Sequence, residues 1–285
     1  MRFPLALLAS LSTLAACGGQ AESDPAAGES ASAAAAPPVV TIIARDFAYE
    51  APDTIAGGLV TLRLVNEGPD LHHVQLVRFD DGKTYADFGT AMQSMQPGAP
   101  PPAWIHDVAG PNSPVPGGQQ ELTQELLPGN YAIVCFIDTP DHVPHVAKGM
   151  VRPLTVVASN GPVPAAPATD VTITMSDYDW TITPALTSGK HVIKLLNTAA
   201  QSHEMFIARL DSGKTAADLM QWAETYKGPP PGTPIGGISG MPQGATAYLP
   251  VDLSPGEYVL LCFLPDAGDG KPHVAHGMVK TVTIS

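Results

Sequence analysis

The chain contains the same segment twice, and this internal duplication constrains its fold more than any other feature. Residues 131–150 read YAIVCFIDTPDHVPHVAKGM, and residues 258–278 read YVLLCFLPDAGDGKPHVAHGM. In each copy an apolar run ends in one Cys, which is followed by a His and then by a Met five positions after that His. A repeated pattern of this kind predicts two structural units of the same type, one in each half of the chain.

The duplication extends upstream to a second histidine. The segments NEGPDLHHVQLVRFDDGKT, ending at Thr84, and NTAAQSHEMFIARLDSGKT, ending at Thr215, pair His72 with His203. Each half therefore holds one thiol, two imidazoles and one thioether in matching places. Soft sulfur donors combined with imidazole suit copper in both of its oxidation states when the arrangement is trigonal. The pattern indicates a blue copper site in each half.

The first seventeen residues are predicted to be a processed signal. Arg2 gives a basic start, residues 3–13 are mostly apolar but too few to span a bilayer, and residues 14–17 read LAAC. This pattern resembles a bacterial lipobox, which implies cleavage before Cys17 and acylation of its thiol. An ordinary secretory signal with a chance cysteine is the alternative. Because Gly18 stands where inner-membrane lipoproteins often carry Asp, we expect an extracytoplasmic protein on the periplasmic side of the outer membrane or on the cell surface.

Residues 18–38 are nearly all Gly, Ala, Ser, Pro, Gln and acidic residues, which predicts a flexible tether. The rest of the chain divides into a first domain, 39–158, a Pro/Ala-rich linker, 159–169, and a second domain, 170–285. The net charge of −13 argues against nucleic acid as a partner and is compatible with a basic redox protein. The membrane is expected to be reached only through the lipid at Cys17.

Short alternating apolar runs separated by turns predict about seven strands in each domain, the number typical of a Greek-key sandwich. The expected class is all-β, with two tandem Greek-key β-sandwich domains and a short helical insert in each. Longer strands are expected near 39–43, 59–66, 72–78, 119–126, 130–136 and 149–157, and near 171–175, 191–197, 203–209, 246–253, 257–263 and 278–284, with short runs at 47–49 and 178–180.

One helix is expected in each domain. Thr84 with Asp87, and Thr215 with Asp218, form starts that resemble a capping box. Apolar residues at helical spacing follow each start, and we interpret them as core and not as a copper-loading stripe. They are Tyr85, Phe88, Met92 and Met95 in the first helix, and Leu219, Trp222 and Tyr226 in the second. The Pro- and Gly-rich stretches 97–118 and 228–244 predict no element.

The order Tyr, three residues, Cys, loop, His, four residues, Met and final strand resembles the cupredoxins. The segments VPHVAKGM and KPHVAHGM are particularly similar to the type 1 copper loop of copper nitrite reductases. The resemblance covers both domains and implies an electron carrier with a type 1 copper ion in each, two per chain. By position, it implies as metal ligands His72, Cys135, His145 and Met150 in the first domain, and His203, Cys262, His273 and Met278 in the second.

The chain departs from this family in three respects, one of which is a long helix-containing insert before the Cys strand that is not typical of small cupredoxins. The loop between Cys and the following His has nine residues in one domain and ten in the other, more than in plastocyanin. The residue after the first ligand His is His73 or Glu204, where the family often has Asn or a hydroxyl residue that hydrogen-bonds around the ligands. This puts that hydrogen bond in doubt.

Copper nitrite reductases and multicopper oxidases have a His immediately before the ligand Cys, which links their copper centres. Val134 and Leu261 occupy those places here, so we predict an electron carrier and no enzyme. A copper store or chaperone is one alternative. A metal-free cupredoxin-like binding module, in which each Cys is a small core residue, is another.

Other readings of the cysteines and histidines stay open from sequence alone. Cys135 and Cys262 could form a disulfide in an exported chain, and His142 competes with His145 for the first site. His145 and His273, with apolar neighbours, are expected to be the partly exposed edges of their sites. The remaining histidines are predicted to lie at the surface: His106, His142, His191 and His276.

Overall fold

The computed structural model describes residues 35–95 and 100–285. The predicted signal, the acylated Cys17 and most of the tether lie outside the described residues. The first half contains β1 (Val39–Arg45), β2 (Ala48–Glu50), β3 (Thr54–Ala56), β4 (Gly58–Asn66), β5 (Gln75–Phe79), α1 (Tyr85–Ser94), β6 (Ile105–Val108), β7 (Gly110–Pro111), β8 (Gln119–Leu126), β9 (Gly129–Val134), the 3₁₀ helix η1 (His145–Lys148) and β10 (Val151–Val157).

The second half repeats this order with two described strands fewer, because it has no counterpart of β3 and has a single strand after its helix where the first half has β6 and β7. It contains β11 (Val171–Ser176), β12 (Asp179–Thr183), β13 (Gly189–Asn197), β14 (His203–Leu210), α2 (Ala216–Thr225), β15 (Gly232–Met241), β16 (Thr246–Leu253), β17 (Gly256–Leu261), the 3₁₀ helix η2 (His273–His276) and β18 (Val279–Ile284). None of the described helices is long and apolar enough to cross a membrane.

Three sheets are formed by these strands. Two five-stranded sheets have the orders β3-β10-β9-β5-β6 and β18-β17-β14-β15-β7. The eight-stranded sheet has the order β12-β11-β13-β16-β8-β4-β1-β2. Its two central strands, β16 and β8, are equivalent strands of the two halves, and the strands on either side of them follow in equivalent order. The predicted class, all-β with two tandem Greek-key sandwiches and one short helix in each, is confirmed.

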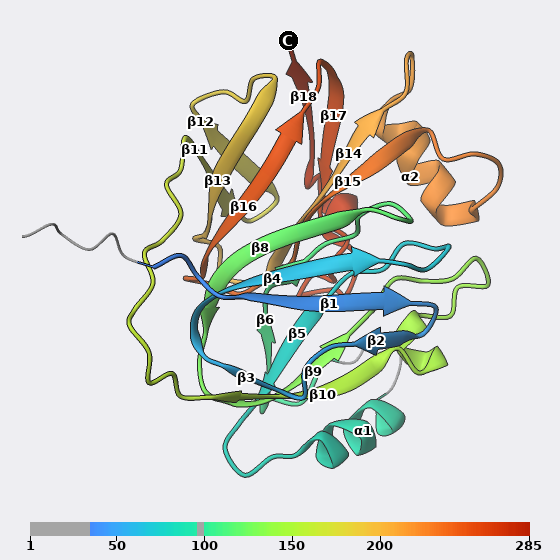
Figure 1. The fold of residues 1–285 in the computed structure, drawn as a ribbon. Coiled ribbons are helices and arrows are strands. Elements are labelled where there is room, and N and C mark those ends of the chain that lie inside the picture. The colour runs from blue at the N-terminus through green and yellow to red at the C-terminus, as the bar shows by residue number, and fades with distance from the viewer. Residues whose placement is uncertain (1–34, 96–99) are drawn as a thin grey trace, which may run out of the picture. The chain divides into compact units, whose positions relative to one another are not determined.

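The eight-stranded sheet is continuous across the two halves (Figure 1). Strand β16 pairs with β8 in antiparallel fashion, with Ala247 opposite Gln124 and Tyr248 opposite Thr123. A second contact pairs β7 with β15, which places Pro111 opposite Ile238. Both contacts join strands at the same position in their own halves, so the halves meet across a pseudo-twofold axis.

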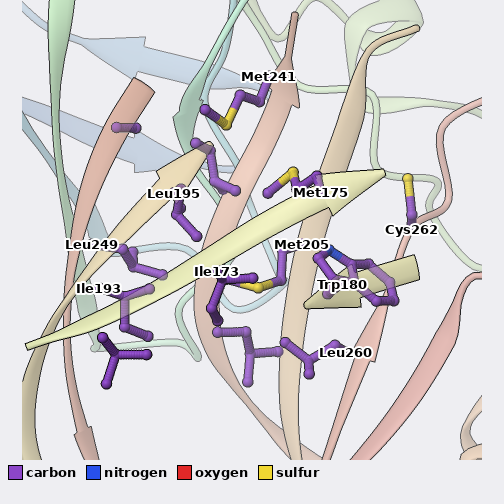
Figure 2. Packing of buried hydrophobic residues seen from close by; sticks show 14 of the residues in the cluster. Ile173, Met175, Trp180, Ile193, Leu195, Met205, Met241, Leu249, Leu260 and Cys262 are labelled. Carbon is purple, nitrogen blue, oxygen red and sulfur yellow. The ribbon is translucent and has the colours of Figure 1, made fainter. Parts of the chain in front are cut away.

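Two hydrophobic clusters fill the sandwiches. The first joins β1, β4, β9 and β10 around fully buried side chains such as Leu62, Leu64 and Ile133, and it includes Cys135. The second surrounds Trp180 and includes Cys262, which Figure 2 shows at one side of the cluster. Ala109 and Leu122 of the first half also belong to this second cluster. Each thiol is therefore held at the boundary of a packed core.

The two helices begin as predicted. The Thr84 hydroxyl accepts from the Asp87 N–H, and the Asp87 carboxylate accepts from the Thr84 N–H; Thr215 and Asp218 repeat this capping box. The interpretation of the first apolar face as core is confirmed, because Phe88 is buried in a cluster against which Tyr85 and Met92 pack. In the second helix, Leu219 is buried and Trp222 packs beside it. Tyr226 is the C-cap, with φ of 50°.

The predicted strands agree with the structure, and two of them, 119–126 and 246–253, agree at both ends with β8 and β16. The strand expected at 72–78 begins only at Gln75, because Val74 donates its N–H to the Pro111 carbonyl, in β7 of the same half, and not to a strand of the β5 sheet.

The stretches that predicted no element contain β6 and β7, and all of β15, a glycine-rich strand. Glycine serves close backbone approach there: a Cβ on Gly237 would lie 1.8 Å from the Met205 carbonyl oxygen, and one on Gly110 would lie 2.0 Å from that of Val74.

Candidate metal centre

Each predicted site begins at the end of a core strand. Strand β9 ends at Val134 and β17 at Leu261, so Cys135 and Cys262 follow directly, and both side chains are fully buried. After the loop, a 3₁₀ turn starts at His145 or His273 and is closed by Gly149 or Gly277 in the left-handed conformation. This turn returns the chain to the last strand of each domain.

Hydrogen bonds of the backbone fix this loop to the cysteine strand. Val146 donates its N–H to the Cys135 carbonyl at 2.8 Å, and Cys135 donates to the Met150 carbonyl at 3.2 Å. Val274 makes the same bond to Cys262 at 2.9 Å. In both halves, this hydrogen bond closes the loop between Cys and His at the same point, although the two loops differ in length by one residue.

In the first half, the structure brings three predicted ligands together. The Nδ1 atoms of His72 and His145 lie 3.1 Å apart, and the Cys135 Sγ lies 3.5 Å from the His145 Nδ1. All three side chains are buried, and their donor atoms lie within 4.8 Å of one another. One metal ion could reach all three.

The second half repeats this arrangement. The Nδ1 atoms of His203 and His273 are 3.0 Å apart, and the Cys262 Sγ lies 3.2 Å from the His273 Nδ1 and 3.9 Å from the His203 Nδ1. Two imidazole nitrogens and one sulfur converge in each half, which is the donor set that copper accepts in both oxidation states. The residues present therefore fit a copper ion.

Met150 and Met278 are fully buried in the same clusters as the cysteines. Each donates its backbone N–H to the carbonyl of the site histidine, at 2.9 Å to His145 and 3.0 Å to His273. These bonds hold each Met next to its His despite the five-residue interval. Their role as thioether ligands stays a prediction.

Sequence reasoning missed a carboxylate at each site. Asp46 Oδ1 lies 3.1 Å from the Nε2 of His72, and Asp177 Oδ1 lies 3.0 Å from the Nε2 of His203. A carboxylate that accepts the Nε2–H leaves Nδ1 free to bind a metal and fixes the plane of the ring. Comparing the halves could have found the pair, since each Asp stands 26 residues before its His and precedes an aromatic residue.

Those aromatic residues cover the second histidine of each site. The Phe47 ring packs edge-on against His145 with centroids 5.2 Å apart, and the Tyr178 ring packs in the same way against His273 at 5.6 Å. As a result His145 is only 1% exposed and His273 is 0% exposed. The prediction that these two histidines form partly exposed edges is wrong, because the turn after the first strand of each half lies over them.

The two covers are held differently. The Tyr178 hydroxyl donates to Asp266 at 2.5 Å, and the Gln201 side-chain amide donates to the same carboxylate at 3.0 Å. Phe47 has no hydroxyl, and the Lys148 Nζ lies 5.4 Å from its ring centroid. The second cover is thus fastened by hydrogen bonds, and the first by packing and a cation–π contact.

The residues after the first ligand histidines tie the two ligand segments together. The Phe136 N–H donates to the Nε2 of His73 at 3.0 Å, and the Phe263 N–H donates to the Glu204 carboxylate at 2.6 Å. The hydrogen bond around the ligands, which the sequence left in doubt, is therefore accepted by an imidazole in one half and by a carboxylate in the other. Both accepting side chains are buried.

Burial sets the protonation states of the donors. It lowers the pKa of His145 to about 4 and that of His73 to about 3, and it also lowers the pKa values of His72, His203 and His273. It raises the pKa of the Cys135 thiol to about 11, and that of Cys262 is raised too. The four imidazoles of the donor sets are therefore neutral and ready to bind at neutral pH, whereas a metal ion must displace the proton of each thiol.

The remaining histidines lie outside both donor sets. His142 is exposed, with its ring 6.0 Å from that of Tyr226. His106 is exposed beside Asp80, and His191 is half-buried beside Asp170. His276 is exposed beside Asp269. Cys135 and Cys262 are both free thiols, so the disulfide alternative is wrong.

No protein-family model matches the chain, and no curated protein matches it. Among solved structures, it is similar to a dithionite-reduced auracyanin from the photosynthetic bacterium Roseiflexus castenholzii, with 21% identity over 43% of this chain and 98% of that one and a TM-score of 0.29. A copper-containing nitrite reductase from Thermus scotoductus has 12% identity over 88% and 62% of the two chains, with a TM-score of 0.24. A multicopper oxidase has 14% identity over 87% and 88%, with a TM-score of 0.24.

Proposed function

We propose that this protein is an extracytoplasmic electron carrier that binds one type 1 copper ion in each half. The convergence of two Nδ1 atoms and one Sγ in a buried site, repeated in both halves, is the observation that supports this proposal most strongly. Such a donor set is offered by neutral imidazoles and a soft sulfur, and these suit Cu(II) and Cu(I) alike.

A bound copper ion would supply a centre that gains and loses a single electron. Around it, Asp46 and Asp177 orient one imidazole of each site. Phe47 and Tyr178 exclude water from the other imidazole. Ligands held by neighbours on several sides keep their places when the charge of the ion changes, which favours rapid electron transfer.

This burial supports a carrier over a copper chaperone, because an ion enclosed by core residues cannot be handed on without opening the site. A carrier is also favoured over an enzyme. The residues before the two cysteines, Val134 and Leu261, are fully buried and apolar, so neither is a ligand for a second copper ion. A metal-free binding module is the remaining alternative, and metal analysis distinguishes it.

Electrons are proposed to pass through the residues that follow the cysteines. Phe136 is 40% exposed and Phe263 is 39% exposed, and each is bonded directly to a Cys whose thiol lies in the donor set. These rings reach the surface where the site histidines do not. The net charge of −13 favours a basic redox partner for a brief contact there.

Adding copper(II) to the metal-free protein from residue 39 onward is expected to give two bound ions and a strong visible thiolate-to-copper absorption band. The reason is that both halves contain a complete donor set. Metal analysis and an absorption spectrum make the test. Protein that stays colourless and holds no copper above a buffer blank would contradict the proposed function and favour the metal-free module.

Membrane attachment through Cys17 is proposed as well, on the basis of the residues 14–17 and the polar tether that follows. Changing Cys17 to Ser should give an exported protein that is released from membranes, because acylation of this residue is the proposed anchor. Cell fractionation with the unchanged protein as reference tests this. A mutant that stayed in the membrane pellet would rule out the lipoprotein assignment.

A further inference from the structure

The contact between the halves reaches both donor sets. Val74, two residues after His72, donates its N–H to the Pro111 carbonyl at 3.0 Å. The next residue, Asn112, donates its N–H to the Gly237 carbonyl at 3.1 Å. The segment 110–112 of the first half is thus bonded on one side to its own metal site and on the other to the second half.

Asn112 continues this contact with its side chain. Its Nδ2 donates to the Glu204 carboxylate at 3.3 Å and lies 3.4 Å from the Ile238 carbonyl, and its Oδ1 accepts from Ser113. Asn112 is 2% exposed and Glu204 is 6% exposed. A buried carboxylate requires a donor for each oxygen, and the described part of the chain gives the Glu204 Oε2 no hydrogen bond except this one.

Glu204 in turn holds the second site at two points. Its Oε1 accepts the Phe263 N–H at 2.6 Å, and its own N–H donates to the Cys262 Sγ at 3.3 Å. Glu204 directly follows the ligand His203. A side chain that fixes Glu204 therefore fixes both the chain beside His203 and the segment that carries the Cys262 thiol. The donor that fixes it comes from the other half of the chain.

The first site has no equivalent support. The residue of the second half that corresponds to Asn112 is Ser239. The equivalent side chains of Asn66 and Asn197 donate to the carbonyls of Pro114 and Met241, which lie two residues after Asn112 and Ser239, respectively. The Ser239 hydroxyl bonds to the Val74 and Gly110 carbonyls, at 2.6 Å and 3.1 Å, and the described structure shows no bond from it to His73.

We propose that Asn112 is a positioning residue of the second metal site, which the first half of the chain completes through Glu204. This inference rests on the proposed function only for the identity of the metal. The contact between the halves thus positions the ligands of the second site and not those of the first, although the two donor sets have the same residue types.

The experiment compares Asn112→Ala in two backgrounds, Cys135→Ser, which leaves the second site, and Cys262→Ser, which leaves the first. Copper(II) is titrated against a competing chelator. We expect the dissociation constant of the second site to rise about tenfold or more, as for other groups that orient metal ligands, and its visible band to shift. The first site should keep both its affinity and its spectrum.

A second readout needs no metal. In the metal-free full chain, Asn112→Ala should speed hydrogen exchange of the Phe263 amide, because this N–H donates to the Glu204 carboxylate. Exchange of the Phe136 amide should be unchanged. The matched control is Ser239→Ala, which removes a hydrogen bond of the same contact without touching Glu204. It should leave the affinity of the second site and the exchange of the Phe263 amide unchanged.

Asn112→Ala alone could destabilise the fold by leaving a buried carboxylate without a donor. Glu204→Gln removes this buried charge, so the Glu204→Gln background separates loss of folding from loss of positioning. In that background Asn112→Ala should cost the second site less than it does beside Glu204, since the two act through one contact. Equal losses at both sites, or no change at the second site and at the Phe263 amide, would overturn the inference. If the Cys→Ser parents bind no copper, the proposed function fails, and the amide exchange still decides the role of Asn112.

Discussion

Replacing Cys135 with Ser is expected to remove about half of the bound copper and of the visible absorption, since each donor set lies within its own half and separate sites contribute additively. A serine hydroxyl is a hard, weakly acidic donor that does not replace a thiolate for copper. The remaining colour should belong to the second site alone. Absorption and metal analysis on the folded protein measure both quantities, and circular dichroism checks the fold.

The matched variant is Cys262→Ser, which should remove the other half. Both cysteines are fully buried at equivalent places, so the two substitutions disturb packing to a similar extent. Loss of all copper from either single variant would show that the ligands are shared between the halves, contrary to the two separate donor sets of the structure.

Replacing His145 with Gly is expected to abolish the spectrum of the first site. Its Nδ1 is the atom nearest to both other donors, at 3.1 Å from that of His72 and 3.5 Å from the Cys135 Sγ. The removed ring leaves a space beneath Phe47 that added imidazole can fill. Exogenous imidazole should therefore restore a blue spectrum, and a titration followed by absorption measures this recovery.

His142→Ala is the control for this substitution, because it removes a histidine from the same loop. His142 is exposed and contacts Tyr226 and not the donor set, so the first-site spectrum should be nearly unchanged. Loss of the spectrum in His142→Ala with its retention in His145→Gly would show that the loop is aligned wrongly.

The sequence predicted those features that both halves repeat with the same residue types. The two Cys-His-Met segments led to the donor sets, and Thr84 with Asp87 led to a helix that begins where expected. These signals are local, since a capping box and a strand that ends in a turn are built from neighbours in the chain. The competition between His142 and His145 stayed open from sequence alone, and the structure places only His145 beside the other donors.

Features that depend on distant partners could not be predicted. Comparing the halves marks Asp46 and Phe47 as repeated positions, but it does not show that the carboxylate contacts His72 or that the Phe47 ring buries His145. Strand β15 lacks the apolar alternation of a strand because its glycines serve close approach to β14 and to the other half. The role of Asn112 follows only from the pairing of β7 with β15.

The pairing of β16 with β8 has a consequence for how such a chain is put together. A single half made alone would expose the edge of β8 or β16, a row of unsatisfied N–H and C=O groups open to pairing. Because corresponding strands meet here across a pseudo-twofold axis, that edge is complementary to a second copy of itself, as in an isologous homodimer. The tandem chain is in effect such a dimer joined covalently, which guarantees both protomers at high effective concentration and lets each diverge.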